Sequence, residues 1–244
     1  MLTRARHFVI VHIPKVAGSS LKESISEKFG SDNICYDYHK PLSVNPILRK
    51  LKCLASSYLT RHIQQKVIFG HFLVGKYANF SMPVFCKRQN WTYITFFRDP
   101  LQRAISHYHF WKRTDDSQHR IWRRFMKENW SLERFLLSKE HANFQSQFLW
   151  RFPVSNFDFI GITEHYNESI QMLGCAFPEF AGLSIRTDNS NPERTAGDNY
   201  TVSPELAEAF KQRNVEDYAI YEQSLKIFEQ QRKSFGNNKI HDKH

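Results

Sequence analysis

Lys15 and the run Gly18-Ser19-Ser20 form a spacing that suits the binding of a phosphate-like anion. They follow an apolar run at 8–13, which predicts a buried strand, and they lead into a helical pattern. The first N–H groups of a helix lack intrahelical partners and carry a partial positive charge. A glycine lets the backbone approach a ligand, while hydroxyl and ammonium groups add donors and positive charge. The stretch departs from the nucleotide pattern G-x-x-x-x-G-K-[ST], so it predicts an anion site of another kind.

A second stretch at 91–108 again predicts a strand, a turn and a helix. Arg98 ends the strand, Pro100 suits the first helical turn, and Ser106 lies two turns into the helix. A guanidinium can bind two phosphate oxygens at once, so Arg98 is a candidate for a second anion-binding position. The alternatives are a salt bridge between Arg98 and Asp99 and an ordinary buried helix serine at Ser106.

Together the two stretches resemble the signature of sulfotransferases that use 3′-phosphoadenosine-5′-phosphosulfate (PAPS). The pattern P-K-x-x-G-[ST]-[ST] resembles their 5′-phosphosulfate loop, and R-D-P-x-x-R-x-x-S-x-[YFW] resembles their 3′-phosphate motif. The likeness is greatest to the carbohydrate branch that includes the heparan sulfate and uronyl 2-O-sulfotransferases, and it extends over residues 8–230. It implies an enzyme that moves the sulfuryl group of PAPS to a carbohydrate hydroxyl without a metal ion.

The resemblance also implies roles for individual residues. Lys15 would contact the 5′-phosphate and the bridging oxygen, and would stabilise the departing 3′-phosphoadenosine-5′-phosphate (PAP). Arg194 lies where related enzymes place a basic loop over the nucleotide. The residues that would bind the donor are Lys15, Ala17, Gly18, Ser19, Ser20, Arg98, Ser106 and Arg194.

His71 is the candidate general base. It follows the apolar run at 67–69, and an imidazole titrates near neutrality, so it can accept a hydroxyl proton at working pH. The glycan 2-O-sulfotransferases carry a catalytic histidine in a similar G-H-[VF] context, which implies the same role here. A structural histidine hydrogen-bonded at a strand end is the alternative. Lys15, His71 and Arg98 all fall just past predicted strand ends, so we expect them at one rim of the sheet. His12 is expected at the same rim, where it would contact the acceptor or act as a second base.

A basic and aromatic stretch at 109–130 has two interpretations. Aromatic faces stack on sugar rings and guanidinium groups pair with carboxylates or sulfates, which predicts a groove for an acidic polysaccharide or glycolipid. Arg113 and Arg123, together with His12, are then the candidate acceptor ligands. In the other interpretation the stretch is a solvated amphipathic helix whose tryptophans face the core.

Composition keeps two other functions open. The 244-residue chain has a net charge of +10 and a pI near 9.5, which favours polyanionic partners and permits a non-catalytic glycan or nucleic-acid binder. We expect no nucleic acid partner if the chain is the enzyme described above. A P-loop-like kinase is the other rival, although G-K-[ST] and a magnesium-binding acidic strand end are both missing from the sequence. No C-x-x-C pair or other ligand cluster predicts a metal site.

The order of apolar and helical patterns predicts the architecture. Short β-branched and aromatic runs indicate buried strands, and helical patterns alternate with them, which predicts a parallel sheet. We therefore expect an α/β fold: a single P-loop-like three-layer domain over 1–235, with a central parallel sheet flanked by helices and a disordered tail at 236–244. The strands are expected at 8–13, 67–69, 92–97 and 158–162, and the helices at 18–29, 101–112, 167–174 and 204–230.

No apolar run reaches the roughly 18 residues that a membrane-spanning helix needs. With no recognisable secretory signal, the sequence predicts a cytoplasmic protein. Several N-x-[ST] triplets keep the Golgi lumen as the alternative, if an N-terminal anchor is missing from this sequence. The triplets begin at Asn79, Asn90, Asn129, Asn167 and Asn199.

Overall fold

The computed structural model describes residues 6–16, 18–39, 41–60, 63–184 and 200–241, with the backbone alone at 18, 19 and 237–241. At its centre is a five-stranded parallel sheet. Its strands are β1 (His7–Val11), β2 (Ile34–Asp37), β3 (Val67–Gly70), β6 (Trp91–Phe97) and β7 (Phe159–Ile162). They are arranged in the order β2-β3-β1-β6-β7, so β1 lies in the middle. Because all five strands are parallel, their carboxyl ends meet at one edge.

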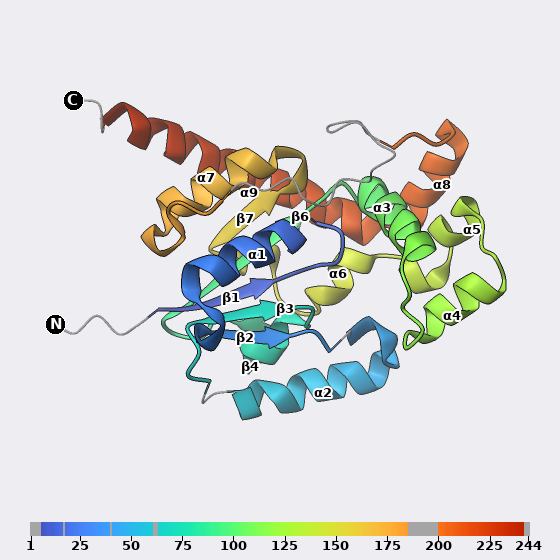
Figure 1. The fold of residues 1–244 in the computed structure, drawn as a ribbon, viewed down its shortest axis with the longest axis horizontal. Coiled ribbons are helices and arrows are strands. Elements are labelled where there is room, and N and C mark those ends of the chain that lie inside the picture. The colour runs from blue at the N-terminus through green and yellow to red at the C-terminus, as the bar shows by residue number, and fades with distance from the viewer. Residues whose placement is uncertain (1–5, 17, 40, 61–62, 185–199, 242–244) are drawn as a thin grey trace.

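Helices flank this sheet (Figure 1). They are α1 (Gly18–Phe29), α2 (Pro46–Leu59), α3 (Pro100–Arg113), α4 (Arg120–Lys127), α5 (Leu132–Leu136), α6 (Phe144–Phe148), α7 (Tyr166–Ala176), α8 (Pro204–Arg213) and α9 (Val215–His241). A separate antiparallel pair is formed by β4 (Asn79–Ser81) and β5 (Val84–Cys86). Helices α7 and α9 both pack against the edge strand β7. The P-loop-like three-layer arrangement expected from the sequence is therefore confirmed.

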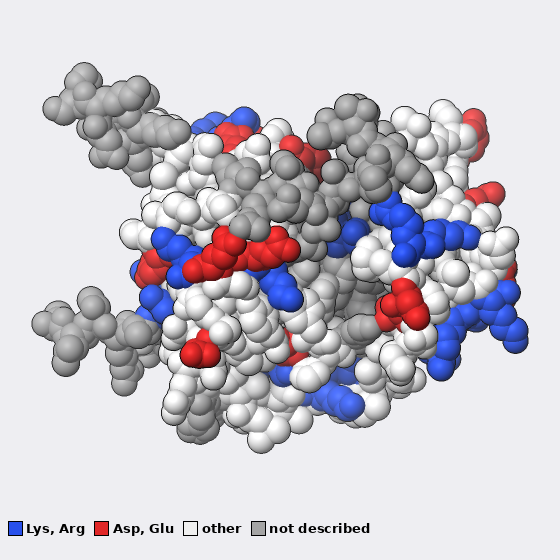
Figure 2. Space-filling model, in the orientation of Figure 1, with Lys and Arg blue, Asp and Glu red and all other residues white. Residues whose placement is uncertain are grey.

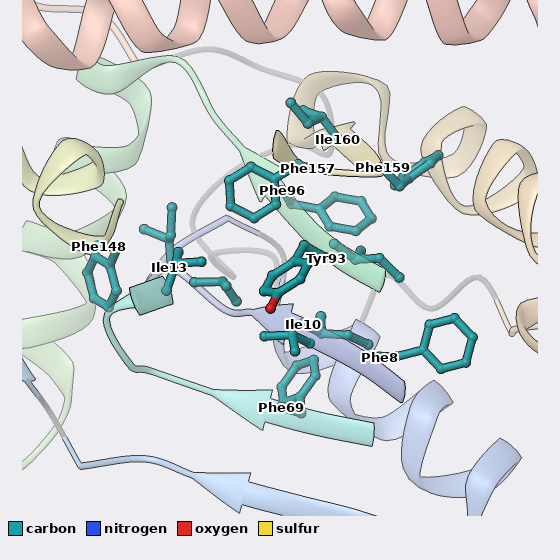
Figure 3. Close-up of a cluster of buried hydrophobic side chains, with 14 of the residues drawn as sticks. Phe8, Ile10, Ile13, Phe69, Tyr93, Phe96, Phe148, Phe157, Phe159 and Ile160 are labelled. Atoms are coloured by element: carbon teal, nitrogen blue, oxygen red, sulfur yellow. The ribbon is translucent and has the colours of Figure 1, made fainter. Parts of the chain in front are cut away.

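The main core surrounds the sheet because its strands are apolar along their whole length. Figure 3 shows aromatic and branched side chains from neighbouring strands packed together, among them Phe8, Ile10, Phe69 and Tyr93. Each of these side chains is at most 1% exposed. A parallel sheet covered on both faces needs such continuous apolar runs, which made β1, β3, β6 and β7 recognisable in the sequence, whereas the short edge strand β2 was not predicted.

A second, smaller core lies beyond the sheet and joins α3, α4, α5 and α8. Trp111 of α3 and Trp130, which precedes α5, are buried within it together with Phe125 and Phe135. These tryptophans therefore face the core, as one of the two interpretations of this stretch expected. They are not the exposed stacking surface that an acidic-glycan groove would need.

The carboxyl-terminal part differs from the expected single helix at 204–230. Helix α8 ends at Arg213 and α9 starts at Val215, with the buried Asn214 between them. The Asn214 side chain donates to the Phe210 carbonyl and accepts from the Asn143 N–H, which replaces the helical bonding at this junction. Helix α9 runs to His241, beyond the boundary at 235 after which a disordered tail was expected. Among the described helices, none combines the length and apolar character required to cross a bilayer.

We predict that Gly161→Ala lowers the free energy of unfolding by about 1–3 kcal/mol, the usual cost of overpacking a core. Gly161 pairs across the sheet with Phe96, and an added Cβ would lie 2.2 Å from a ring carbon of that buried phenylalanine. Gly236→Ala in α9 is the matched control, because a Cβ there meets no atom within 4 Å. Denaturant unfolding of both variants measures the difference, and an equal effect would contradict this account of the β6–β7 packing.

Candidate active site

The carboxyl ends of the five strands bring polar side chains to one rim of the sheet. The residues that follow the strands, in order across the sheet, are Tyr38 after β2, His71 after β3, His12 and Lys15 after β1, Arg98 after β6 and Glu164 after β7. Ligands of open parallel sheets bind outside this edge. The sequence predicted that Lys15, His71 and Arg98 would meet here, and the topology brings them together.

The turn between β1 and α1 has an unusual backbone at Lys15. Its φ angle is +72°, a left-handed conformation that residues other than glycine and asparagine seldom adopt. The guanidinium of Arg98 donates to the Lys15 carbonyl over 3.3 Å, and the neighbouring Val16 is buried. The ammonium of Lys15 lies 4.4 Å from the centroid of the Phe110 ring. Tertiary contacts from α3 and the end of β6 therefore hold this strained turn in place.

Positive charge is concentrated around Lys15. Burial, together with the nearby guanidinium groups of Arg98, Arg113 and Arg103, lowers the pKa of Lys15 to about 8. Like charges raise the free energy of the protonated lysine, and an anion placed among them would lower it. The electrostatics of the rim therefore favour a negatively charged ligand.

Arg98 is fixed through its main chain. Its N–H donates to Oε1 of Gln145 over 3.3 Å, and its carbonyl accepts from Nε2 of the same side chain over 3.0 Å. The carboxylate of Asp217 in α9 accepts the backbone N–H groups of Gln145 and Ser146. A chain of hydrogen bonds thus runs from α9 through α6 to Arg98.

The side chain of Arg98 has Glu164 as its ion-pair partner, with Nε and Oε1 3.9 Å apart. Glu164 also accepts from the Asp99 N–H and from the Tyr221 hydroxyl. Asp99 caps α3 by accepting from the Gln102 N–H over 2.9 Å. The salt bridge considered from the sequence is therefore made with Glu164, while Asp99 serves the helix.

Arg103 of α3 is buried, which is unusual for a charged side chain. It is 1% exposed, and its guanidinium lies 4.1 Å from the centroid of the Phe144 ring. Burial lowers the pKa of Arg103 to about 10, so it remains charged at neutral pH. Its position one turn before the buried His107 places it on the inward face of α3.

Two histidines and a tyrosine form a compact group at the rim. The rings of His12 and His71 are 4.4 Å apart between centroids, and Tyr38 packs edge-on to His71 at 4.7 Å. The Tyr38 hydroxyl lies 3.4 Å from Nδ1 of His12. Burial, then the neighbouring His71, Lys15 and Lys22, hold the pKa of His12 well below its usual value. His12 is therefore neutral at physiological pH, so it carries no positive charge that would compete with Lys15 for an anion.

A pocket of about 320 Å³ opens beside His71. Pro14, Tyr38 and His71 contribute from the strand ends, and the other walls come from the single helical turn Pro41–Ser43 and from 107–148. The pocket adjoins the turn between β1 and α1, because Phe110 lines the pocket and also contacts the ammonium of Lys15. An acceptor in this pocket would lie between the candidate base and the candidate donor site.

The other residues predicted from the sequence fall into three groups. Ser20 is buried in α1, and Ser106 is half-buried near the end of the second turn of α3. Arg113 and Arg123 are exposed and do not line the pocket beside His71. Ala17 and Arg194, and the side chains of Gly18 and Ser19, lie outside the described residues. The predicted roles of all these residues remain predictions.

The described residues that flank 185–199 are held at the site. Ser184 hydrogen-bonds to Ser24 of α1, and Tyr200 exchanges two hydrogen bonds with the Gln102 side chain of α3. His109 stacks on the Tyr200 ring at 5.4 Å. Both flanks of the segment that contains Arg194 are therefore anchored to α1 and α3, the helices that follow β1 and β6.

Sequence analysis missed Tyr38, Gln145 and Asp217. Tyr38 follows the short edge strand β2, which was not among the strands expected from the sequence. Gln145 and Asp217 lie far from Arg98 in the sequence, and neither belongs to a motif. In the part of the chain that the structure describes, no group of three or more His, Cys, Asp or Glu is placed to hold a metal ion.

Comparison with known proteins gives limited guidance. No protein-family model and no curated protein matches this sequence. Among solved structures, the chain is similar to the mouse sulfotransferase SULT7A1 complexed with PAP, at 15% sequence identity and a TM-score of 0.45. The similarity covers 90% of this chain and 89% of that one. At this level of similarity, the function has to be inferred from the site itself.

We predict that Gln145→Met weakens PAP binding by about tenfold or more, which corresponds to the loss of ~1.4 kcal/mol of the Arg98 contact. Methionine keeps the length of the side chain and removes both hydrogen bonds to the Arg98 main chain. Gln147→Met is the matched control, because Gln147 lies in the same helix but bonds Arg49 and the Ala142 carbonyl. Calorimetric titration with PAP measures both variants. Equal affinities would show that Gln145 does not position Arg98.

Proposed function

We propose that this chain is a PAPS-dependent O-sulfotransferase, for which the sequence resemblance implies a carbohydrate acceptor. The observation that carries the proposal is the concentration of cations around Lys15, immediately beside the pocket that His71 lines. A donor with negative charge at both its 5′ and its 3′ end suits this arrangement. Lys15 and the start of α1 would hold the 5′ end, and Arg98 with Ser106 would hold the 3′-phosphate.

The transfer itself needs two actions from the protein. His71 accepts the proton of the acceptor hydroxyl while the acceptor oxygen forms a bond to sulfur. The bond between sulfur and the bridging oxygen breaks, and its electron pair stays on the 5′-phosphate of PAP. Lys15 stabilises that new negative charge, as preorganised cations do at a developing anion. Nδ1 of His71 is buried, so we assign Nε2 as the nitrogen that takes the proton.

The neutral His12 has a place in this scheme. Its ring lies beside His71, and two imidazolium groups at 4.4 Å would repel each other. A His12 that stays neutral leaves His71 free to become positively charged after proton transfer. Tyr38 completes the group and restricts how the His71 ring can turn.

The rival functions make different demands. A polyanion binder would need an extended basic surface, whereas Figure 2 shows Lys and Arg on this face in separate groups among acidic residues. A kinase would bind ATP with magnesium. Calorimetric titration with PAP, ATP and adenosine 5′-phosphosulfate, each without magnesium, separates these possibilities. Preferential PAP binding that Arg98→Ala abolishes supports the proposal, and equal binding of ATP contradicts it.

We predict that PAP binding weakens as pH rises through about 8. The anion binds the protonated form of Lys15, whose pKa in the ligand-free protein is lowered to about 8. Above that pH the affinity should fall toward a limit of about tenfold per pH unit, because a proton must be taken up on binding. Lys15→Arg is the control, since a guanidinium stays charged throughout this range. Its affinity should be independent of pH between about 7 and 9.5, and a parallel decline would contradict the role of Lys15.

We predict that His71→Ala lowers turnover by about 10²–10⁴-fold, the usual contribution of a general base. PAP affinity should stay within about twofold of the wild type, because His71 faces the acceptor pocket rather than the cation cluster. His7→Ala is the control, since His7 is the first residue of β1 and lies at the amino-terminal end of the strands, away from His71. The rate of PAP release from PAPS with an acceptor measures both. An unchanged rate in His71→Ala would remove the proposed base.

A further inference from the structure

The walls of the pocket beside His71 are largely aromatic. Phe110 and Trp111 of α3 and Phe144 and Phe148 of α6 line it, together with Pro14 and Leu42. Its volume of about 320 Å³ lies at the lower end of the range for small-molecule sites. Such a space accommodates one flat ring with short substituents. It is too small to enclose several sugars of a polysaccharide.

No Lys or Arg occurs among the described residues that line this pocket. The buried histidines in its wall do not replace them. Arg103 donates to Nδ1 of His107 over 3.3 Å, and since arginine only donates, that nitrogen must be unprotonated. Burial and the charge of Arg103 hold the pKa of both His107 and His141 well below the usual value. The wall that these histidines form is therefore uncharged at neutral pH.

The charges that the pocket does contain are negative. Asp115, Asp116 and Glu140 contribute to its lining. Glu140 pairs with Arg124 outside the lining at 2.9 Å, and Asp115 accepts from the Ser117 N–H over 2.8 Å. The two aspartates lie two and three residues after Arg113, the last residue of α3, where the negative end of the helix dipole adds to their charge. The Thr114 hydroxyl satisfies the Phe110 carbonyl at this helix end.

Within the proposed function, we infer that the acceptor is a compact hydroxyl compound with one flat apolar ring and a positively charged amino group. Its ring lies among Phe110, Trp111 and Phe144, its ammonium group is near Asp115 and Asp116, and its hydroxyl faces His71. This acceptor is the opposite of the acidic polysaccharide that the sequence favoured. A carboxylate or sulfate buried in this pocket would meet acidic groups without a compensating cation from the described lining.

The test compares three phenols of nearly identical shape that differ in charge: tyramine, 4-ethylphenol and 4-hydroxyphenylacetate. Each is offered to the full chain with PAPS, and the rate of PAP release gives kcat/KM. Each is also titrated onto PAP-saturated protein. This measures the affinity even of a compound that binds with its hydroxyl in a position where it cannot react. We expect tyramine to exceed 4-hydroxyphenylacetate by at least about tenfold, with 4-ethylphenol between them.

The double variant Asp115→Asn/Asp116→Asn tests whether the two aspartates cause the preference for tyramine. It should reduce the advantage of tyramine over 4-ethylphenol by about tenfold while PAP affinity is unchanged. Asp32→Asn is the matched control, because Asp32 follows α1 and does not line the pocket. The inference is overturned if 4-hydroxyphenylacetate is accepted as well as tyramine, if the preference survives in the double variant, or if none of the three compounds binds.

The parallel PAP titration keeps the two proposals separate. If PAP binds and the amine is not preferred, the acceptor class is wrong and the sulfotransferase proposal stands. If PAP does not bind, the proposed function fails. Titration of the three phenols onto ligand-free protein then still decides whether the pocket selects a cation.

Discussion

Repulsion among like charges is the constraint around which this site is organised. Burial, and then the charges of Arg98, Arg113 and Arg103, bring the pKa of Lys15 down to about 8. Left to themselves, flexible cationic side chains would separate into solvent. That they remain together means that the surrounding fold holds each of them, and the free energy stored in this arrangement is recovered when an anion binds.

The restraint comes mainly from the carboxyl-terminal half of the chain. Asp217 of α9 holds the start of α6, and Gln145 of α6 holds the main chain of Arg98. Glu164, at the end of β7, joins Arg98 to Tyr221 of α9. Helix α9 is therefore part of the site without contacting a ligand itself. A short α/β core that lacked α9 would keep the motifs and lose the means to hold them in place.

The sequence predicted the parts that local patterns determine. Lys15, His71 and Arg98 follow three strands whose apolar runs are unmistakable, and parallel topology then requires that they meet at one edge. The inward position of Arg103 could not be predicted, because a charged residue is buried only when distant groups such as Phe144 and Asp217 come close to it in the fold. The pocket beside His71 could not be predicted for the same reason, since its walls come from segments far apart in the chain.

The proposed donor side and the proposed acceptor pocket differ in charge although they are adjacent. Two aromatic rings form the boundary between them. Phe110 lies against the ammonium of Lys15, Phe144 lies against the guanidinium of Arg103, and both rings line the pocket. A ring that stabilises a cation through its face presents to the pocket an apolar surface rather than a charge. In the proposed function, a strongly anionic donor and an acceptor of the opposite charge can therefore bind next to each other.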